Sequence, residues 1–190
     1  MGIDPGTNRM GYGVLEVRHN TVVCIAMGDI ELGRLPDAYA KLRRIFEQVS
    51  GLIEEYRPDE VALESPFFGE NVQSMLKLGR AQGVAMAAAL HKELPVFEYA
   101  PRRIKQAVTG TGGAAKEQVA AMLKSMLGVE YNPKRLDATD GLAVALCHYI
   151  VVTSPLPAPS HRKSDGTRGA SASWEEFLAR NPERAIKNKR

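Results

Sequence analysis

Four carboxylates occupy positions where a negative charge is costly unless something compensates it. Asp4 precedes Pro-Gly at the end of a short apolar start, and Glu64 ends the apolar stretch 61–63. Asp137 and Asp140 are three residues apart in a helical pattern, so they share one face and repel each other. A divalent cation would remove that penalty. Because no His or Cys cluster accompanies these oxygen donors, the pattern indicates Mg²⁺ or Mn²⁺ and not zinc.

Each of the four acids also has an ordinary structural explanation. Asp4 before Pro-Gly fits an Asx-type turn, and Glu64 fits a solvated strand end. Asp137 and Asp140 fit the first turns of a helix, whose dipole they would complement. Two metal ions about 3.5–4 Å apart can instead activate a water and stabilise the leaving oxygen in phosphodiester hydrolysis. Residue positions alone leave both explanations open.

The elements that would position these acids follow from the spacing of apolar residues. Together with the opening segment, residues 10–18 and 21–32 predict three consecutive, mostly antiparallel strands. Apolar residues at helical spacing over 42–56 predict a helix, which ends at Arg57-Pro58. The short apolar run 61–63 predicts a strand buried on both faces, as in a parallel sheet.

The second half of the chain is predicted to be mainly helical. A helix over 71–92, crowded with Ala, Gly and Met, is either deeply buried or shared with a partner chain. A strand "PVFEYAP" and two helices around the glycine-rich loop "TGTGG" follow, and Asn132-Pro133 predicts the start of the last helix. This order predicts an α/β fold with a mixed sheet, in which ligands gather at the carboxyl ends of the parallel strands. Asp4 and Glu64 both lie at such ends.

Composition divides the 190 residues into a body and a tail. Residues 154–190 hold eight Lys and Arg against four Asp and Glu, whereas residues 1–153 hold 17 against 18. We expect one domain over 1–153 and a basic, disordered tail over 154–190, with a short helix over 173–186. The tail would raise non-specific affinity for DNA.

Several other classes of protein and site are disfavoured. Cys24 and Cys147 lie far apart, which favours free buried thiols in a reducing compartment. The chain has no leader pattern and no apolar run of membrane-spanning length, so we expect a cytoplasmic protein. "GTGGAAKE" lacks the Gly-Lys-Ser/Thr of a nucleotide P-loop. His148, deep in the last predicted helix, is interpreted as structural.

Four stretches together resemble the RuvC family of Holliday junction resolvases: "GIDPGTNRMGYGV", "VALESPFFGENVQSMLKLGRAQGV", "YAPRRIKQAVTGTGGAAKEQV" and "LDATDGLAVALCH". The resemblance covers residues 2–150 in the family's order and spacing. It implies an RNase H-like fold with a mixed five-stranded sheet flanked by helices, a homodimer, and metal-dependent nicking of two symmetric strands at a four-way DNA junction. The family's acidic tetrad falls on Asp4, Glu64, Asp137 and Asp140, which would bind two Mg²⁺ ions, or Mn²⁺ in their place.

The resemblance also assigns residues that would grip DNA. Lys105 and Lys116 flank the glycine-rich loop and would lie near the active site in contact with DNA; the alternative is that they are two solvated helix lysines. Phe67 and Phe68 follow Glu64 in a predicted loop and would stack on or wedge between bases, with Phe67 the better wedge, unless they pack into the core. The family implies the branch-migration proteins RuvA and RuvB as partners.

Two departures and two rival functions remain. The family's first strand has a few more apolar residues before Gly2, so a shortened first strand is expected here, and the tail beyond residue 154 matches no family motif. A non-catalytic relative would bind junctions without cutting them. An actin-like or sugar-kinase-like ATPase fragment would share the "GIDPGTNRMG" loop but needs a duplicated domain, and the sequence shows no repeat.

Overall fold

The computed structural model describes residues 1–19, 21–66, 71–133 and 135–154. It contains a five-stranded sheet made of β1 (Gly2–Asp4), β2 (Arg9–Arg18), β3 (Thr21–Glu31), β4 (Val61–Glu64) and β5 (Val96–Tyr99). Five helices accompany the sheet: α1 (Ala38–Tyr56), α2 (Val72–His91), α3 (Pro101–Thr109), α4 (Lys116–Leu127) and α5 (Asp137–Thr153). The predicted α/β class with a mixed sheet is confirmed.

The strands lie in the order β3-β2-β1-β4-β5. Strands β1, β2 and β3 pair antiparallel, as the sequence predicts for three consecutive strands. Strand β1 also pairs in parallel with β4, and β4 pairs in parallel with β5. The carboxyl ends of these three parallel strands therefore meet at one edge of the sheet.

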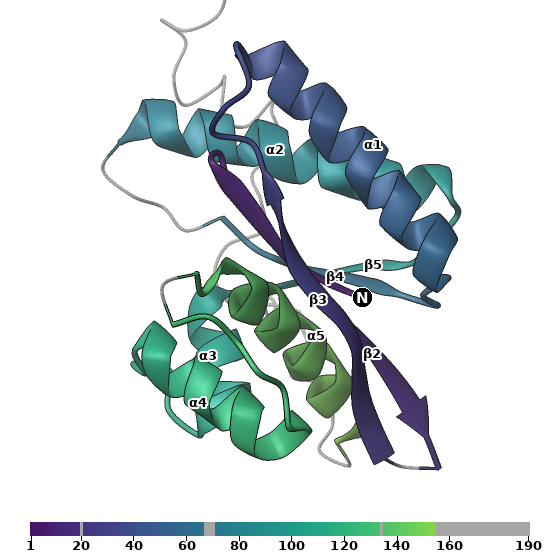
Figure 1. The fold of residues 1–190 in the computed structure, drawn as a ribbon, viewed down its shortest axis with the longest axis vertical. Coiled ribbons are helices and arrows are strands. Elements are labelled where there is room, and N and C mark those ends of the chain that lie inside the picture. Colours follow the sequence, from purple (N-terminus) through teal and green to yellow (C-terminus); the bar gives the residue numbers. More distant parts are fainter. Residues whose placement is uncertain (20, 67–70, 134, 155–190) are drawn as a thin grey trace, which may run out of the picture. The chain divides into compact units, whose positions relative to one another are not determined.

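Helices cover both faces of the sheet (Figure 1). Neighbouring residues of β4 contribute to opposite cores: Val61 and Leu63 pack with α1 and α2, whereas Ala62 packs with α3, α4 and α5. A strand with helices on both sides has no solvated face, which explains its continuous apolar run. The helix α1 ends at Arg57, where the chain turns in a left-handed conformation (φ 45°), as the Arg-Pro signal predicts.

The start of the last helix differs from the prediction. Asn132-Pro133 is a favourable local start, but α5 begins at Asp137, and the preceding residues form a turn in which the Arg135 amide donates to the Asn132 carbonyl (2.9 Å). Arg135 also pairs with Asp29 of β3, at 2.6 Å between Nη2 and Oδ2. This contact joins residues 106 apart in sequence and ties the segment before α5 to β3.

Two other expectations concern the thiols and membranes. Cys24 and Cys147 are free thiols, half-buried and buried respectively, as expected. None of the helices within the described ranges has the length and apolar character needed to span a bilayer. The predicted tail and its helix over 173–186 lie outside the described residues apart from Ser154, and they stay predictions.

Candidate functional site

Asp4 and Glu64 end neighbouring parallel strands. In the register of β1 and β4, Ile3 lies opposite Leu63, so the following residues, Asp4 and Glu64, come next along the two strands. The predicted placement of both carboxylates at one sheet edge is confirmed. An Asx-type turn would explain Asp4 alone. It does not explain why the Glu64 carboxylate, from a different strand, lies at the same sheet edge.

The first turn of α5 brings Asp137 and Asp140 to the same edge. The helix α5 can pack close to the sheet because each of the two surfaces in contact carries a glycine, Gly141 on α5 and Gly11 on β2. A Cβ on Gly141 would lie 2.4 Å from the Tyr12 backbone nitrogen, and one on Gly11 would lie 1.8 Å from the Asp137 carbonyl oxygen. Such contacts are far shorter than real Cβ atoms make. The spacing of α5 from β2, and with it the position of both aspartates, therefore depends on these glycines.

Three of the four carboxylates have raised pKa values, chiefly because they are buried and also because of their negative neighbours. Burial, reinforced by the nearby charges of Glu64, Asp140 and Asp137, raises the pKa of Asp4 to about 8. Burial and the charge of Asp140 raise the pKa of Glu64 to about 7. Burial is also the main reason why the pKa of Asp140 is raised. The protein thus gathers acids where their negative charge is unfavourable, which is the arrangement that a bound cation would relieve.

Two lysines flank this acidic group, as predicted. Lys116, the first residue of α4, donates to Asp140, whose side chain is only 12% exposed. Burial lowers the pKa of Lys116, but this bond and the neighbouring acids outweigh it, so the pKa is raised overall. Lys105 on α3 lies close enough to lower the pKa values of Glu64 and Asp140. Both lysines therefore lie near the carboxylates, whereas their contact with DNA stays a prediction.

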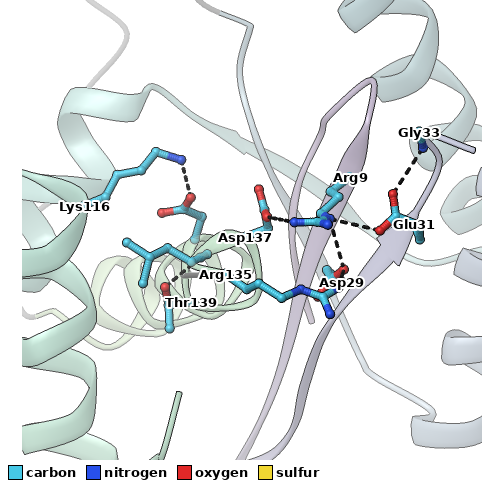
Figure 2. Close-up of polar contacts among 10 residues, drawn as sticks. Arg9, Asp29, Glu31, Gly33, Lys116, Arg135, Asp137 and Thr139 are labelled. Carbon is cyan, nitrogen blue, oxygen red and sulfur yellow. Dashed lines mark hydrogen bonds and ion pairs between the residues drawn. The ribbon is translucent and has the colours of Figure 1, made fainter. Parts of the chain in front are cut away.

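Arg9 is a third cation at the site and has no signal in the sequence. Its Nη1 atom lies 3.9 Å from Asp137 Oδ2. Figure 2 shows Asp137 facing Arg9. The other aspartate of α5, Asp140, is the one to which Lys116 donates. Among the described residues, no group of three or more Asp, Glu, His or Cys side chains is arranged to enclose a metal ion. The donor set nevertheless fits a hard divalent cation, because it consists of carboxylates, and burial makes the charge of Asp4, Glu64 and Asp140 costly.

Gln82, on α2, contacts the backbone of the site and, like Arg9, was not predicted from the sequence. It is buried on α2, and its Nε2 atom donates to the Glu64 carbonyl oxygen (3.3 Å) and to Glu98 Oε1 (2.7 Å). A cavity of about 110 Å³ lies between this side chain and the carboxylates, lined by Asp4, Pro5, Glu64, Ser65, Pro66, Leu78 and Gln82. A single glutamine within a helical pattern gives no signal of such a contact before the fold is known.

Three further residues were singled out from the sequence. Phe67 and Phe68 are outside the described residues, so their wedge role stays a prediction. His148 is buried and bonded through Nδ1 to the Tyr99 hydroxyl and through Nε2 to Glu60, both at 2.7 Å. These contacts tie α5 to the segments before β4 and at the end of β5, which supports the structural interpretation of His148.

Known proteins resemble this chain over most of its length. A family model described as "Crossover junction endodeoxyribonuclease RuvC" matches residues 1–148. A relative of that name from Porphyromonas gingivalis is 53% identical over 186 residues, covering 97% of this chain and 95% of the relative. Another from Cytophaga hutchinsonii is 52% identical over 184 residues, covering 97% of this chain and 86% of the relative.

Solved structures agree with the sequence comparisons. The structure of Thermus thermophilus RuvC superimposes with a TM-score of 0.71 at 33% identity, covering 80% of this chain and 93% of that one. T. thermophilus RuvC in complex with a Holliday junction substrate also gives 0.71, at 34% identity, covering 78% of this chain and 90% of that one. The described fold is therefore shared with proteins of this kind.

Proposed function

Because this chain belongs to the RuvC family of crossover junction endodeoxyribonucleases, we propose that it resolves four-way DNA junctions by nicking two strands symmetrically during recombination and repair. The protein is a nuclease of RNase H-like fold, which hydrolyses phosphodiester bonds. The observation that best supports the proposal is the grouping of four carboxylates and two lysines at the edge where β1, β4 and α5 meet. An actin-like or sugar-kinase-like ATPase fragment gains no support from this family match.

The family implies dependence on a divalent metal, which we infer to be Mg²⁺, with Mn²⁺ as a substitute. Asp4, Glu64, Asp137 and Asp140 would hold two ions, and bound metal would supply an activated water and stabilise charge on the leaving oxygen. The products would carry a 3′-hydroxyl and a 5′-phosphate. The raised pKa values of Asp4 and Glu64 support this assignment, because a cation at these carboxylates would offset their burial and mutual repulsion.

Lys105 and Lys116 would neutralise phosphates of the bound strand. Lys116 is 57% exposed although it donates to Asp140, so its ammonium group can turn from that carboxylate towards a phosphate. The glycine-rich loop between α3 and α4 leads directly to Lys116, and the amino end of α4 would add a favourable dipole. Phe67, which follows Ser65 by two residues, would enter the junction as the wedge, together with Phe68.

The proposed function is tested by product analysis on an end-labelled four-way junction, with linear duplex as the matched substrate. We expect paired nicks at symmetric positions that yield ligatable duplexes, only when Mg²⁺ or Mn²⁺ is present. Linear duplex should be cut far more slowly. Tight junction binding without nicks in either metal would favour the alternative of a non-catalytic junction-binding relative.

A homodimer is supported by the outward face of α2. Val72, Leu76 and Leu90 recur at helical spacing and are 63%, 52% and 59% exposed. Gly79 and Gly83 lie between them on the same face, and a Cβ on either glycine would meet nothing within 4 Å in the part of its own chain that the structure describes. The chain's own packing therefore does not require these small residues, whereas a second copy of α2 could approach closely at them. A two-fold dimer would match the two symmetric cuts.

The variant Gly83→Glu is expected to separate such a dimer. It places two carboxylates at the centre of the contact, which should raise the dissociation constant by on the order of 100-fold. Sedimentation equilibrium would measure the change from twice the 20.8 kDa chain mass towards the monomer. Gly51→Glu on α1 is the matched control, because Gly51 is also exposed, helical and free of Cβ contacts. A wild-type chain that sediments as a monomer at micromolar concentrations would contradict the proposal.

Family membership is also the basis for inferring the protein's partners and its location. We infer that RuvA and RuvB deliver the junction and that the protein works in the cytoplasm. Co-sedimentation with RuvA-bound junctions would test the first inference.

A further inference from the structure

Arg9 reaches the acidic group because of its place in β2. Alternate residues of this strand face α5, and Gly11, two residues beyond Arg9, is the one against which the Asp137 carbonyl packs. Arg9 is thereby placed next to the first residue of the helix. The register of β2 and β3 also sets Arg9 opposite Glu31, so the same side chain has acids on two sides.

The guanidinium group is shared unequally between these acids. Arg9 Nε donates to Glu31 Oε2 at 3.0 Å, within normal hydrogen-bond range. It lies 3.9 Å from Asp29 Oδ2, and Nη1 lies 3.9 Å from Asp137 Oδ2. Figure 2 shows Arg9 between Asp137 on one side and the two acids of β3 on the other. The contact with Asp137 is therefore an ion pair without a close hydrogen bond, and Glu31 is the firmer anchor.

Asp29 has a cation of its own. Arg135 Nη2 donates to Asp29 Oδ2 at 2.6 Å, and the Asp29 side chain is only 13% exposed. Asp29 thus does not need Arg9 as its main counter-ion. The two arginines carry the same charge in one network, but Arg9 faces Asp137 and Arg135 is bonded to Asp29.

We propose that Arg9 is the resident counter-ion of Asp137 and that a divalent metal competes with it for this carboxylate. Arg9 is then a positioning residue that sets the metal concentration at which the site fills. A bound ion must replace the 3.9 Å ion pair at Asp137, and because Glu31 keeps the guanidinium group in place, its positive charge stays near the ion and opposes binding. This inference rests on the proposed function, in which Asp137 is a metal ligand.

The test is Mn²⁺ binding without DNA, measured by the electron paramagnetic resonance signal of free Mn²⁺ in a titration of the full chain. Arg9→Met removes the competing charge but keeps an unbranched side chain, and it should tighten Mn²⁺ binding about tenfold. Arg18→Met is the matched control, since it removes an equal charge from the far end of the same strand, where Arg18 is exposed and pairs with Glu16. Its affinity should stay within about threefold of the wild type, because a distant charge is screened.

The outcomes separate direct competition from its alternatives. Equal tightening in both variants would mean that only net charge matters, and weaker or unchanged binding in Arg9→Met would mean that Arg9 does not compete; either result overturns the proposal. An Asp137→Asn variant that binds Mn²⁺ as well as the wild type would instead overturn the assignment of Asp137 in the proposed function, and the competition with it. If Asp137→Asn weakens binding while Arg9→Met leaves it unchanged, only the role of Arg9 fails.

Discussion

Replacing Asp4 with Asn is expected to lower the rate of junction nicking on the order of 10³-fold, because a ligand that supplies several kcal/mol of transition-state stabilisation is lost. Junction affinity should stay within about threefold of the wild type, since the proposed phosphate contacts are cations, Lys105 and Lys116, and not Asp4. The rate is measured by single-turnover nicking of an end-labelled junction, and the affinity by gel shift without divalent metal.

Asp59→Asn is the matched control for this experiment. Asp59 is exposed and precedes β4, at the opposite end of the strand from Glu64. The same chemical change there should leave nicking near the wild-type rate. If Asp4→Asn nicks within tenfold of the wild type, Asp4 is not an essential ligand.

The same substitution is expected to stabilise the metal-free protein at alkaline pH. The folded protein raises the pKa of Asp4 from 3.8 to about 8, chiefly by burial, so the folded state holds a proton that the unfolded chain has already released. Stability is therefore fully present below about pH 4 and is lost as the pH rises through about 8. Asn at position 4 removes that loss. We expect the variant to melt on the order of 5 °C higher than the wild type at pH 9 in chelator, and nearly equally at pH 4.

Thermal melts across this pH range would separate the two explanations for Asp4. A turn residue that points to solvent would give the wild type and the variant parallel melting curves against pH. A higher melting temperature together with lost nicking would mean that the acid is kept at a cost to stability, as expected for a site built to receive a cation. Added Mn²⁺ should then stabilise the wild type more than the variant.

The sequence was sufficient to predict the sheet edge where this site lies. Apolar runs ending in Asp4 and Glu64 predicted two strands, and the parallel pairing of β1 with β4 makes the acids neighbours. The spacing of apolar residues and the length of apolar runs predict strands because both depend on which faces of an element are buried. These patterns do not predict which individual polar side chains contact each other across the fold.

For that reason Arg9 and Gln82 were missed. The contact of Arg9 with Asp137 depends on the register of β2 and β3 and on the close approach at Gly11. The bond from Gln82 to the Glu64 carbonyl depends on the rotation of α2 over β4. The helix start predicted at Asn132 was wrong, and the segment before α5 instead makes a tertiary contact, the Arg135–Asp29 pair, that a local capping preference does not reveal.

The substitution Gly141→Ala is expected to have the second large effect, because α5 packs closely against β2 at this glycine. The added Cβ would lie 2.4 Å from the Tyr12 nitrogen and 2.5 Å from Tyr12 Cα and from the Gly11 carbonyl carbon, all of them backbone atoms. Because no flexible side chain can yield, α5 must move away from β2. We expect a loss of about 2–3 kcal/mol in the free energy of unfolding, measured by urea denaturation.

The movement of α5 should also be visible in catalysis. Asp137 and Asp140 lie within the turn that precedes Gly141, so a shift of about 1 Å in α5 carries both carboxylates with it and should slow nicking by on the order of 100-fold at a temperature where the variant is folded. Gly51→Ala on α1 is the control, because its Cβ would meet nothing within 4 Å, and it should gain about 0.5–1 kcal/mol from helix propensity. Wild-type stability and nicking in Gly141→Ala would mean that α5 does not rest on β2 as described. Lower stability with wild-type nicking would mean instead that the aspartates do not depend on this contact for their position.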